Sequence, residues 1–234
     1  MCFSAEASLG VAVVLLPVGG FCVAAAWHKD RRYLLLAVIP LLFGLQQVCE
    51  AGVWAGLGRA VPELGRAASR SFLFFALAFW PVWVPLSAAA VEPPGARRTV
   101  CLALAGLGLT VALVYYPPLV PDGGWAGTRI VGHSIRHDFS AIPAVHVAPG
   151  WVWPAAYLSA VCAPFLAVRD HRLWPLGAAV AVSAAVSYVA FREAFASVWC
   201  FLAAILSVYI AYVLHGLRPN GFPDSRTPEP VSAL

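Results

Sequence analysis

Three polar side chains with helical spacing interrupt a long apolar stretch. Gln46, Gln47 and Glu50 lie three and four residues apart within residues 33–57, a segment made mostly of apolar residues. Residues with this spacing share one face of a helix, and Trp54 extends the same stripe by one more turn. A carboxyl group inside an apolar span is costly and usually marks a functional site. Glu50 is therefore the candidate catalytic acid, with Gln46, Gln47 and Trp54 as substrate-binding neighbours.

The expected chemistry is acid catalysis on an apolar substrate. Surrounded by apolar helices, Glu50 would be held as a neutral carboxylic acid that can protonate an alkene or an epoxide. Trp80, Trp83 and Trp199 lie deep in apolar stretches, where their π faces could stabilise a carbocation. A lipid or isoprenoid-like molecule is the substrate class that this arrangement favours.

Further candidates lie in the longest connection and before the last apolar stretch. Glu193 or His133 would receive the final proton of such a reaction. His133 and His137 are four residues apart and could both face a metal ion if that stretch is helical, with Asp138 or His146 completing the set. A solvated loop explains the same histidines, and the metal stays undetermined. The sequence indicates no particular cofactor.

Structural roles compete with these functional ones. Glu50 could hydrogen-bond across helices, or pair with Arg129, Arg136 or Arg192, only to fix the bundle. Glu193 follows Arg192 at the start of a span, where a helix amino terminus favours acidic residues.

Seven apolar runs must position these residues. A helix of about 20 residues crosses about 30 Å of hydrocarbon. The hydrophobic share of 61%, the charged share of 11% and the mean hydropathy of +0.80 leave too little polar surface for a soluble globule. We predict an all-α integral membrane bundle of seven transmembrane helices over residues 1–215 and a short disordered tail over 216–234. The spans are 9–27, 33–57, 71–91, 99–116, 149–168, 173–191 and 194–214.

The basic residues of the connections predict the orientation. With seven spans, nine Lys and Arg residues lie on one side and six on the other, which places the amino terminus outside and the carboxyl terminus in the cytoplasm. Glu50, Glu193 and the long connection then share the outer half. We expect a multi-pass protein of the bacterial cytoplasmic membrane. Its arginines are scattered and form no basic stripe, so we expect membrane lipids as partners and no nucleic acid.

The cysteines suggest packed thiols more than a disulfide framework. Cys2, Cys49 and Cys200 are expected near the outer side, where a thiol pair or a soft-metal site is geometrically feasible. No Cys-x-x-Cys motif strengthens that alternative.

Three segments resemble those of a known family. The start Met-Cys-Phe-Ser-Ala, residues 46–54 and residues 197–204 are similar to small polytopic membrane proteins typical of actinomycetes, a family of unknown function. The resemblance implies a membrane fold and no activity. In size and helix count the chain also resembles the membrane-bound terpene cyclases of meroterpenoid pathways, which use intramembrane carboxyl groups as acids. The alternatives from other classes are a small-solute or proton-coupled transporter and a non-catalytic membrane subunit.

Overall fold

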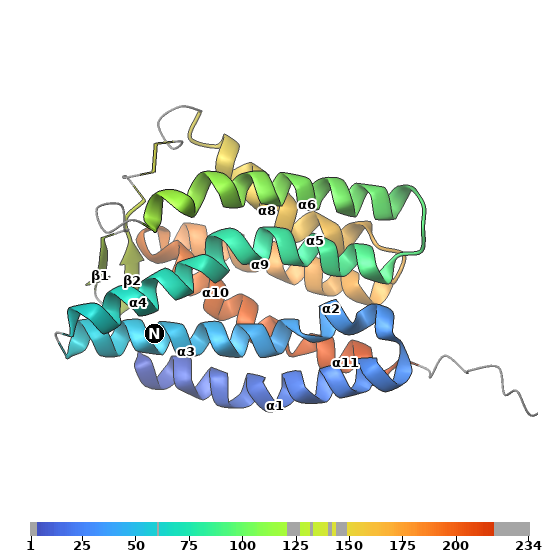
Figure 1. Cartoon of the computed structure of the whole chain (residues 1–234), viewed down its shortest axis with the longest axis horizontal. Coiled ribbons are helices and arrows are strands. Elements are labelled where there is room, and N and C mark those ends of the chain that lie inside the picture. The colour runs from blue at the N-terminus through green and yellow to red at the C-terminus, as the bar shows by residue number, and fades with distance from the viewer. Residues whose placement is uncertain are drawn as a thin grey trace, which may run out of the picture.

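The chain folds as an elongated helical bundle with a small β-hairpin at one end. The computed structural model describes residues 4–59, 61–120, 127–131, 133–139, 142–143 and 149–217. Most helices run along the long axis of the molecule, and the hairpin lies beside the end where α3 passes into α4 (Figure 1). We call this the hairpin end, and we call the other, where α1 passes into α2, the Asp170 end.

The helices follow the predicted apolar runs. Their bounds are α1 Ala5–Lys29, α2 Leu34–Ala37, α3 Ile39–Gly58, α4 Pro62–Leu73, α5 Trp80–Val91, α6 Ala96–Tyr115, α8 Val152–Ala167, α9 Trp174–Ala190, α10 Phe195–Leu206 and α11 Tyr209–His215. Short 3₁₀ turns precede several of them, at Arg31–Tyr33, His171–Leu173 and Arg192–Ala194.

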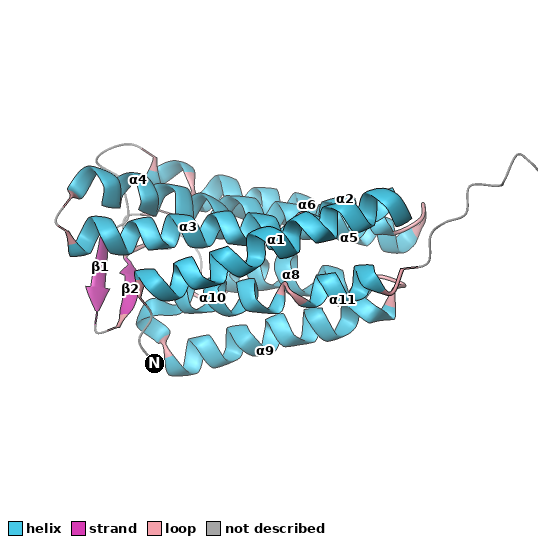
Figure 2. Ribbon diagram, turned by 90° about the horizontal axis from the view of Figure 1, so that it is seen from below, coloured by secondary structure: helices cyan, strands magenta, loops and turns pink. Residues whose placement is uncertain are grey.

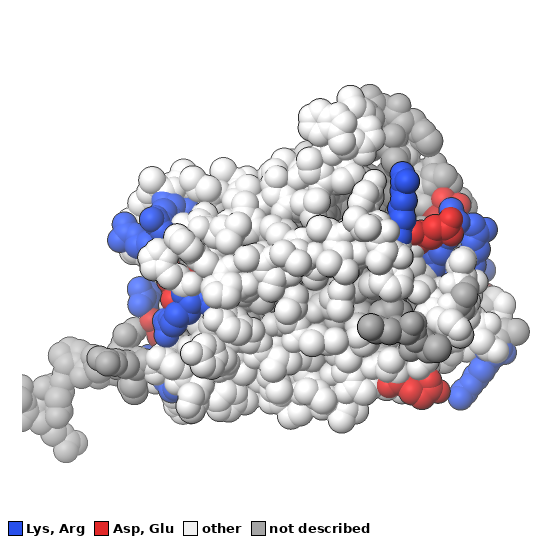
Figure 3. Space-filling model, turned by 180° about the vertical axis from the view of Figure 1, so that it is seen from behind, with Lys and Arg blue, Asp and Glu red and all other residues white. Residues whose placement is uncertain are grey.

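Six helical segments are long and apolar enough to cross a membrane. They are Ala5–Lys29, Arg31–Gly58, Pro62–Val91, Ala96–Leu119, His171–Ala190 and Arg192–His215, with mean hydropathy between 1.6 and 2.3 in their most apolar windows. On the face drawn in Figure 3, the charged residues gather at the two ends of the molecule and leave an uncharged belt between them. The prediction of an all-α fold with multiple apolar spans is therefore confirmed for six of them.

The fifth predicted span, residues 149–168, corresponds to α8 and is the one not among the six. This helix is apolar but has only 16 residues, which gives a length of about 24 Å against about 30 Å of hydrocarbon. A seventh span and the orientation of the termini remain predictions. The predicted tail lies outside the described residues from 218 onward.

The third span is irregular in its middle, where Pro81 and Pro85 predict a kink but the residue types indicate no π-helical segment. Phe74–Phe79 forms a π-helical segment between α4 and α5, and the Trp80 N–H bonds to the carbonyl of Phe75, five residues earlier. In the same pattern Ala76 O would need an N–H from Pro81, which proline lacks. The Tyr157 hydroxyl of α8 donates to Ala76 O instead. A side chain from another helix therefore replaces a missing backbone bond.

Glycines allow two pairs of helices to come into backbone contact. A Cβ atom on Gly56 of α3 would collide with the backbone of Gly65 in α4. A Cβ atom on Gly108 of α6 would collide with the carbonyl of Pro81 in α5. These positions hold the second, third and fourth apolar spans closely together.

The stretch that contains the histidines forms a hairpin and not a helix. β1 (Thr128–Val131) pairs antiparallel with β2 (Ser134–His137), so that Thr128 lies opposite His137 and Val131 opposite Ser134. His133 therefore lies in the turn and His137 at the other end of β2, about 13 Å apart at the rise of a strand. The prediction that His133 and His137 share one face of a helix is therefore wrong, and the metal site that depended on this face is not formed by that spacing. Figure 2 shows the hairpin at the end of the bundle below α3 and α4.

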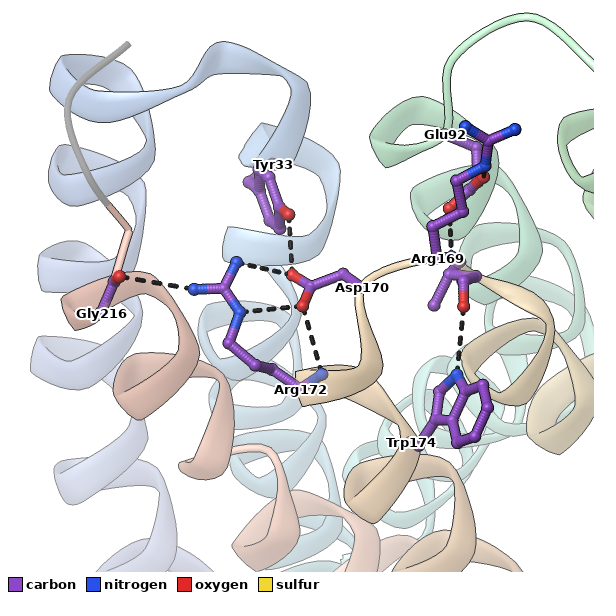
Figure 4. Close-up of polar contacts among 8 residues, drawn as sticks. Tyr33, Glu92, Arg169, Asp170, Arg172, Trp174 and Gly216 are labelled. Carbon is purple, nitrogen blue, oxygen red and sulfur yellow. Dashed lines mark hydrogen bonds and ion pairs between the residues drawn. The ribbon is translucent and has the colours of Figure 1, made fainter.

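Hydrogen bonds and ion pairs close the Asp170 end (Figure 4). Asp170 accepts a hydrogen bond from Tyr33 Oη at 2.8 Å, and from Arg172 Nε and Nη2 at 2.8 Å each. Burial raises the pKa of Asp170, but the hydrogen bonds from Arg172 and Tyr33 outweigh it and the net pKa is lowered. Lys29 Nζ donates to the carbonyls of Leu214 and His215 at the end of the last helix. Together these contacts join the ends of the first, second and last helices to the start of α9.

Two apolar cores fill the bundle. The larger one runs through its length and includes Leu15, Leu36, Val84, Leu173 and Ile210. The smaller core lies at the hairpin end, where Phe72, Leu77, Leu119, Ile142 and Cys200 pack together. The polar residues of α3 lie next to this smaller core, because Cys49 packs against it.

Candidate functional site

Five polar side chains from three helices meet inside the hairpin-side half of the bundle. Gln46 and Gln47 are 0% exposed and Glu50 is 2% exposed, while Ser8 of α1 and Ser197 of α10 are equally buried. The shared face predicted from the spacing in α3 thus points into the bundle. We call Ser8, Gln46, Gln47, Glu50 and Ser197 the Glu50 cluster.

Glu50 is the centre of the cluster. Ser197 Oγ donates a hydrogen bond to Glu50 Oε1. Ser8 and Gln47 also face this carboxyl group, and the thiol of Cys200 lies near both Glu50 and Gln46. None of the ion pairs formed by the described residues includes Glu50, so pairing with an arginine is not its role in this structure.

Several polar atoms of the cluster lack a hydrogen-bond partner within the described part of the chain. They are Glu50 Oε2, Gln46 Nε2, and both Oε1 and Nε2 of Gln47. Leaving a buried polar group unsatisfied costs about 1–3 kcal/mol. Four such atoms in one place are unusual in a folded interior and make the cluster the candidate binding site.

A small apolar cavity adjoins the cluster. Trp80 Nε1 donates to Gln46 Oε1 at 2.7 Å, and the Trp80 ring stacks on Phe43 with 4.0 Å between centroids. Both rings line a cavity of about 40 Å³, together with Tyr157, Trp199 and Cys200. Trp80 and Cys200 therefore face the cavity on one side and the cluster on the other. Glu50 itself does not line the cavity.

Hydrogen bonds hold the cavity tryptophans in place. Trp199 Nε1 donates to Ser183 Oγ at 3.2 Å and to Val180 O at 3.3 Å, both on α9. Tyr157 approaches the Trp199 ring edge-on at 5.6 Å between centroids. Of the predicted substrate-binding tryptophans, Trp80 and Trp199 thus share one cavity.

The other two tryptophans lie elsewhere. Trp83 donates to Leu35 O at 3.0 Å and is stacked on Phe79, facing away from the cavity. Trp54 is half-buried one turn beyond Glu50, and its Nε1 has no partner among the described residues. Of the four tryptophans predicted to bind substrate, Trp80 and Trp199 therefore line the cavity, whereas Trp54 and Trp83 do not.

His137 is a buried residue of the hairpin and packs on the smaller core. Its ring stacks on Phe72 at 5.3 Å between centroids, and its Nδ1 shares a hydrogen bond with Thr128 Oγ1 at 3.1 Å. Complete burial lowers the pKa of His137 to about 4. His137 is therefore neutral near pH 7, and its contacts are those of a residue that packs the hairpin onto the bundle.

The remaining predicted residues face the surface. Arg136 Nη1 donates to Glu193 Oε2 at 2.9 Å, and the Glu193 side chain is 62% exposed. His133 is exposed, Asp138 is half-buried, and His146 lies outside the described residues. Glu193 lies one helical turn before Ser197, but its carboxylate turns toward the hairpin and not toward Glu50. Among the described residues, no group of three or more His, Cys, Asp or Glu side chains could hold a metal ion.

The cysteines that the structure describes are free thiols. Cys49 and Cys200 contribute to the same small core at the hairpin end, one half-buried and one buried. Cys2 lies outside the described residues. Within the described ranges, the interpretation as packed thiols agrees with these positions.

One member of the site was missed by reasoning from the sequence. Ser8 lies in the first turn of an apolar helix and carries no spacing signal toward Glu50. Glu193, Ser197 and Cys200 follow helical spacing in the last span, so the sequence does predict a shared face for Ser197 and Cys200. The Ser197-x-x-Cys200 spacing was the available signal, and it could not reveal the partner helix.

Six apolar helices of this length are those expected of a multi-pass membrane protein, and the Glu50 cluster lies between three of the helices. A family model described as "Family of unknown function (DUF6629)" matches residues 1–223, so the chain belongs to this family. No curated protein and no solved structure matches the chain. The predicted membership of an uncharacterised family is confirmed, whereas its bacterial source stays a prediction.

Proposed function

We propose that this protein is a membrane-embedded enzyme that acts on an apolar, lipid- or isoprenoid-like substrate, with Glu50 as its carboxylic acid. The supporting observation is Glu50 Oε2, a buried carboxyl oxygen without a partner among the described residues. We further propose seven spans, with α8 as the short one, in the cytoplasmic membrane of a bacterium and with the hairpin end outside.

The surroundings of Glu50 suit an acid that gives up its proton to a substrate. An ionised carboxylate without a paired cation is expensive among apolar helices, so we propose that Glu50 carries its proton in the resting state. Ser197 occupies Oε1 and leaves Oε2 as the position from which a proton can be given. The amide groups of Gln46 and Gln47 would then orient the reacting group.

The aromatic cavity supports an apolar substrate that becomes positively charged. Phe43, Trp80, Tyr157 and Trp199 present rings to one space, and ring faces stabilise cations. At about 40 Å³ the cavity is far smaller than the roughly 150 Å³ of a cavity that binds benzene. The closed form therefore holds no more than the reacting end of a substrate, and the helices must separate to admit it.

The geometry does not support the other predicted catalytic residues. Glu193 pairs with Arg136, His137 is buried in the hairpin, and His133 is exposed. None of them contacts the Glu50 cluster through a described interaction, so the proposal gives them no catalytic role. A transporter is less well supported, because the large apolar core fills the bundle between the cluster and the Asp170 end.

The proposal is tested by the lipids that the protein converts. Wild-type protein and a Glu50→Gln variant would be expressed in the same host, and the lipid extracts of membranes and purified protein compared by mass spectrometry. Glutamine keeps an acceptor for Ser197 but has no acidic proton, so we expect product formation to fall by at least about 100-fold, as for loss of a general acid.

A matched control uses a surface carboxyl group. The Glu63 side chain of α4 is 84% exposed, and its Oε1 lies 3.8 Å from Arg66 Nη1, the long distance of a weak ion pair. A Glu63→Gln variant should therefore keep the wild-type lipid profile. A lipid product is recognised as a species that is absent from the host without the protein. If the Glu50→Gln variant and the wild type formed the same product in the same amount, acid catalysis by Glu50 would be excluded.

A further inference from the structure

An open apolar groove runs along the third and fourth spans, on the surface that faces away from the interior of the bundle. It measures about 290 Å³ and lies between the π-helical segment with α5 on one side and α6 on the other. Its lining residues, all in the described part of the chain, are apolar or aromatic and include Phe74, Phe79, Trp83, Leu109 and Leu113. This volume is at the lower end of those of ligand pockets, which span about 300–1,000 Å³.

Two side chains in contact, Phe79 and Trp80, lie between this groove and the internal cavity. Phe79 lines the groove, stacks on Trp83 at 4.9 Å and meets Trp80 edge-on at 5.2 Å between centroids. Trp80 lines the internal cavity and bonds to Gln46 of the Glu50 cluster. The sequence of contacts from the membrane face to the cluster is therefore Phe79, Trp80 and Gln46.

The helix that carries these two side chains lacks regular backbone bonding. Its residues Phe74–Phe79 are π-helical, and Pro81 and Pro85 provide no backbone N–H to the preceding turn. One of the carbonyls left free is taken by Tyr157. π-helical segments and prolines are the usual sites of helix bending, so the wall between groove and cavity can move at lower cost than a regular helix.

The surroundings of the groove indicate what occupies it. Leu113 is 63% exposed and Phe74 40% exposed, and both belong to segments long and apolar enough to cross a membrane. Such a groove faces lipid hydrocarbon and not water. At its hairpin end lies Tyr116, whose hydroxyl donates to Arg70 O at 3.5 Å, and the positive charge of Arg70 is close by. An apolar channel that ends beside a cation matches a hydrocarbon chain with an anionic head group.

We propose that this groove is the lateral entry site for the hydrocarbon chain of a membrane lipid, and that Phe79 is its gate. The chain lies between α5 and α6, and its reacting end passes Phe79 into the cavity when the π-helical segment bends. This inference rests on the proposed function and narrows it, because it makes the substrate a membrane lipid that enters from the bilayer and not a molecule that enters from water.

The first measurement is the site of lipid contact. Full-length protein in vesicles that contain a phospholipid with a diazirine in its acyl chain would be irradiated, and the labelled peptides identified by mass spectrometry. We expect labelling at residues 74–83 and 109–117 to exceed, several-fold, that of α9, whose Val182 and Val189 are also exposed to lipid. Equal labelling of both faces would overturn the proposal.

Variants that fill the groove give the second measurement. Ala78 lines it, so Ala78→Trp, or the smaller change Ala78→Leu if the first does not fold, should lower groove labelling several-fold. Val182→Trp is the matched control on another lipid-facing helix and should leave groove labelling unchanged. Undiminished labelling in the folded Ala78 variant would also overturn the proposal.

The Glu50→Gln variant separates this inference from the proposed function. Groove labelling should persist in that variant, because Glu50 does not line the groove. Persistent labelling with unchanged product would mean that the groove binds lipid but that Glu50 is not the acid. Lost product with uniform labelling would mean that Glu50 acts on a substrate that enters by another route.

Discussion

The two ends of the bundle treat buried polar groups in opposite ways. At the Asp170 end, the Asp170 carboxylate accepts hydrogen bonds from Tyr33 and Arg172 (Figure 4). Lys29 donates to the last carbonyls of the final helix. In the hairpin-side half, Glu50 has one hydrogen-bonded oxygen and one without a partner among the described residues. Beside it, Gln46 Nε2 and both side-chain polar atoms of Gln47 also lack a partner there.

The difference separates polar groups that are paired with one another from polar groups that lack partners, which the proposed function assigns to catalysis. A satisfied network joins helix ends and contributes to stability, whereas unsatisfied buried atoms cost stability and persist where something else is gained. One atom departs from this contrast, since Glu92 Oε2 at the Asp170 end is 3.9 Å from Arg169 Nε and has no hydrogen bond. Its other oxygen accepts the Arg169 N–H, so Glu92 still ties α5 to the end of α8.

The largest expected effect is at Asp170. Replacing Asp170 by Ala removes the acceptor of Tyr33 and of the Arg172 guanidinium, and should lower the free energy of unfolding by about 3 kcal/mol, as for loss of charged hydrogen bonds. SDS titration of the purified protein, followed by circular dichroism, measures this change. Glu63→Ala at the exposed pair with Arg66 should change it by less than about 0.5 kcal/mol. If Asp170→Ala and Glu63→Ala lowered the free energy of unfolding equally, the hydrogen-bonded network at Asp170 would contribute no more than an exposed ion pair.

A similar effect should follow from acidification at the hairpin. Unfolded His137 binds a proton below about pH 6.5, whereas folded His137 resists protonation until about pH 4. The unfolded state therefore binds more protons within this window, and the free energy of unfolding decreases as the pH falls through it, by about 3 kcal/mol in total. Thermal unfolding at several pH values would show this, and the difference between wild type and His137→Gln isolates the histidine. A difference that stays constant from about pH 7 to about pH 4 would contradict the buried, neutral state.

The two adjacent glutamines should respond in opposite ways. Gln46→Leu leaves the buried Trp80 Nε1 without an acceptor and should destabilise the protein by about 1–3 kcal/mol. Gln47→Leu removes an amide that has no hydrogen-bond partner among the described residues, and should be neutral or slightly stabilising. The same SDS titration measures both. Activity should fall in both variants, because each removes a polar group of the cluster. A large loss of stability in Gln47→Leu would show that this residue is structural.

The smallest expected effect is at Glu193. Its ion pair with Arg136 is exposed, and such pairs contribute about 0–1 kcal/mol. Glu193→Gln should therefore change neither stability nor lipid conversion appreciably, in contrast to Glu50→Gln. If Glu193→Gln abolished conversion while the protein stayed folded, the separation between the two carboxylates would be wrong, and Glu193 would return as the proton acceptor.

The sequence was sufficient for the helices and for one face of the site. Span positions follow from apolar length, and the inward face of Gln46, Gln47 and Glu50 follows from their spacing. The partners of that face could not be predicted, since Ser8 and Ser197 come from helices whose relative positions are set by packing. The hairpin was not predicted either, because the four-residue separation of His133 and His137 was interpreted as the spacing of a helix.

The irregular third span shows another limit of the sequence. Pro81 and Pro85 predict a kink, but the hydrogen bond from the Tyr157 hydroxyl to Ala76 O joins residues 81 positions apart and could not be predicted from the sequence. Cavity size could not be predicted either, because it depends on how closely the rings of Phe43, Trp80 and Trp199 approach one another.

Glu50 and Ser197 are separated by 147 residues and come from the second and the last apolar spans. During synthesis the carboxyl group therefore enters the membrane long before its hydroxyl partner has been made. Until α10 packs against α3, the early helices carry a carboxyl group without its hydroxyl partner. The Glu50 cluster is thus assembled only when the last of the six apolar spans has packed.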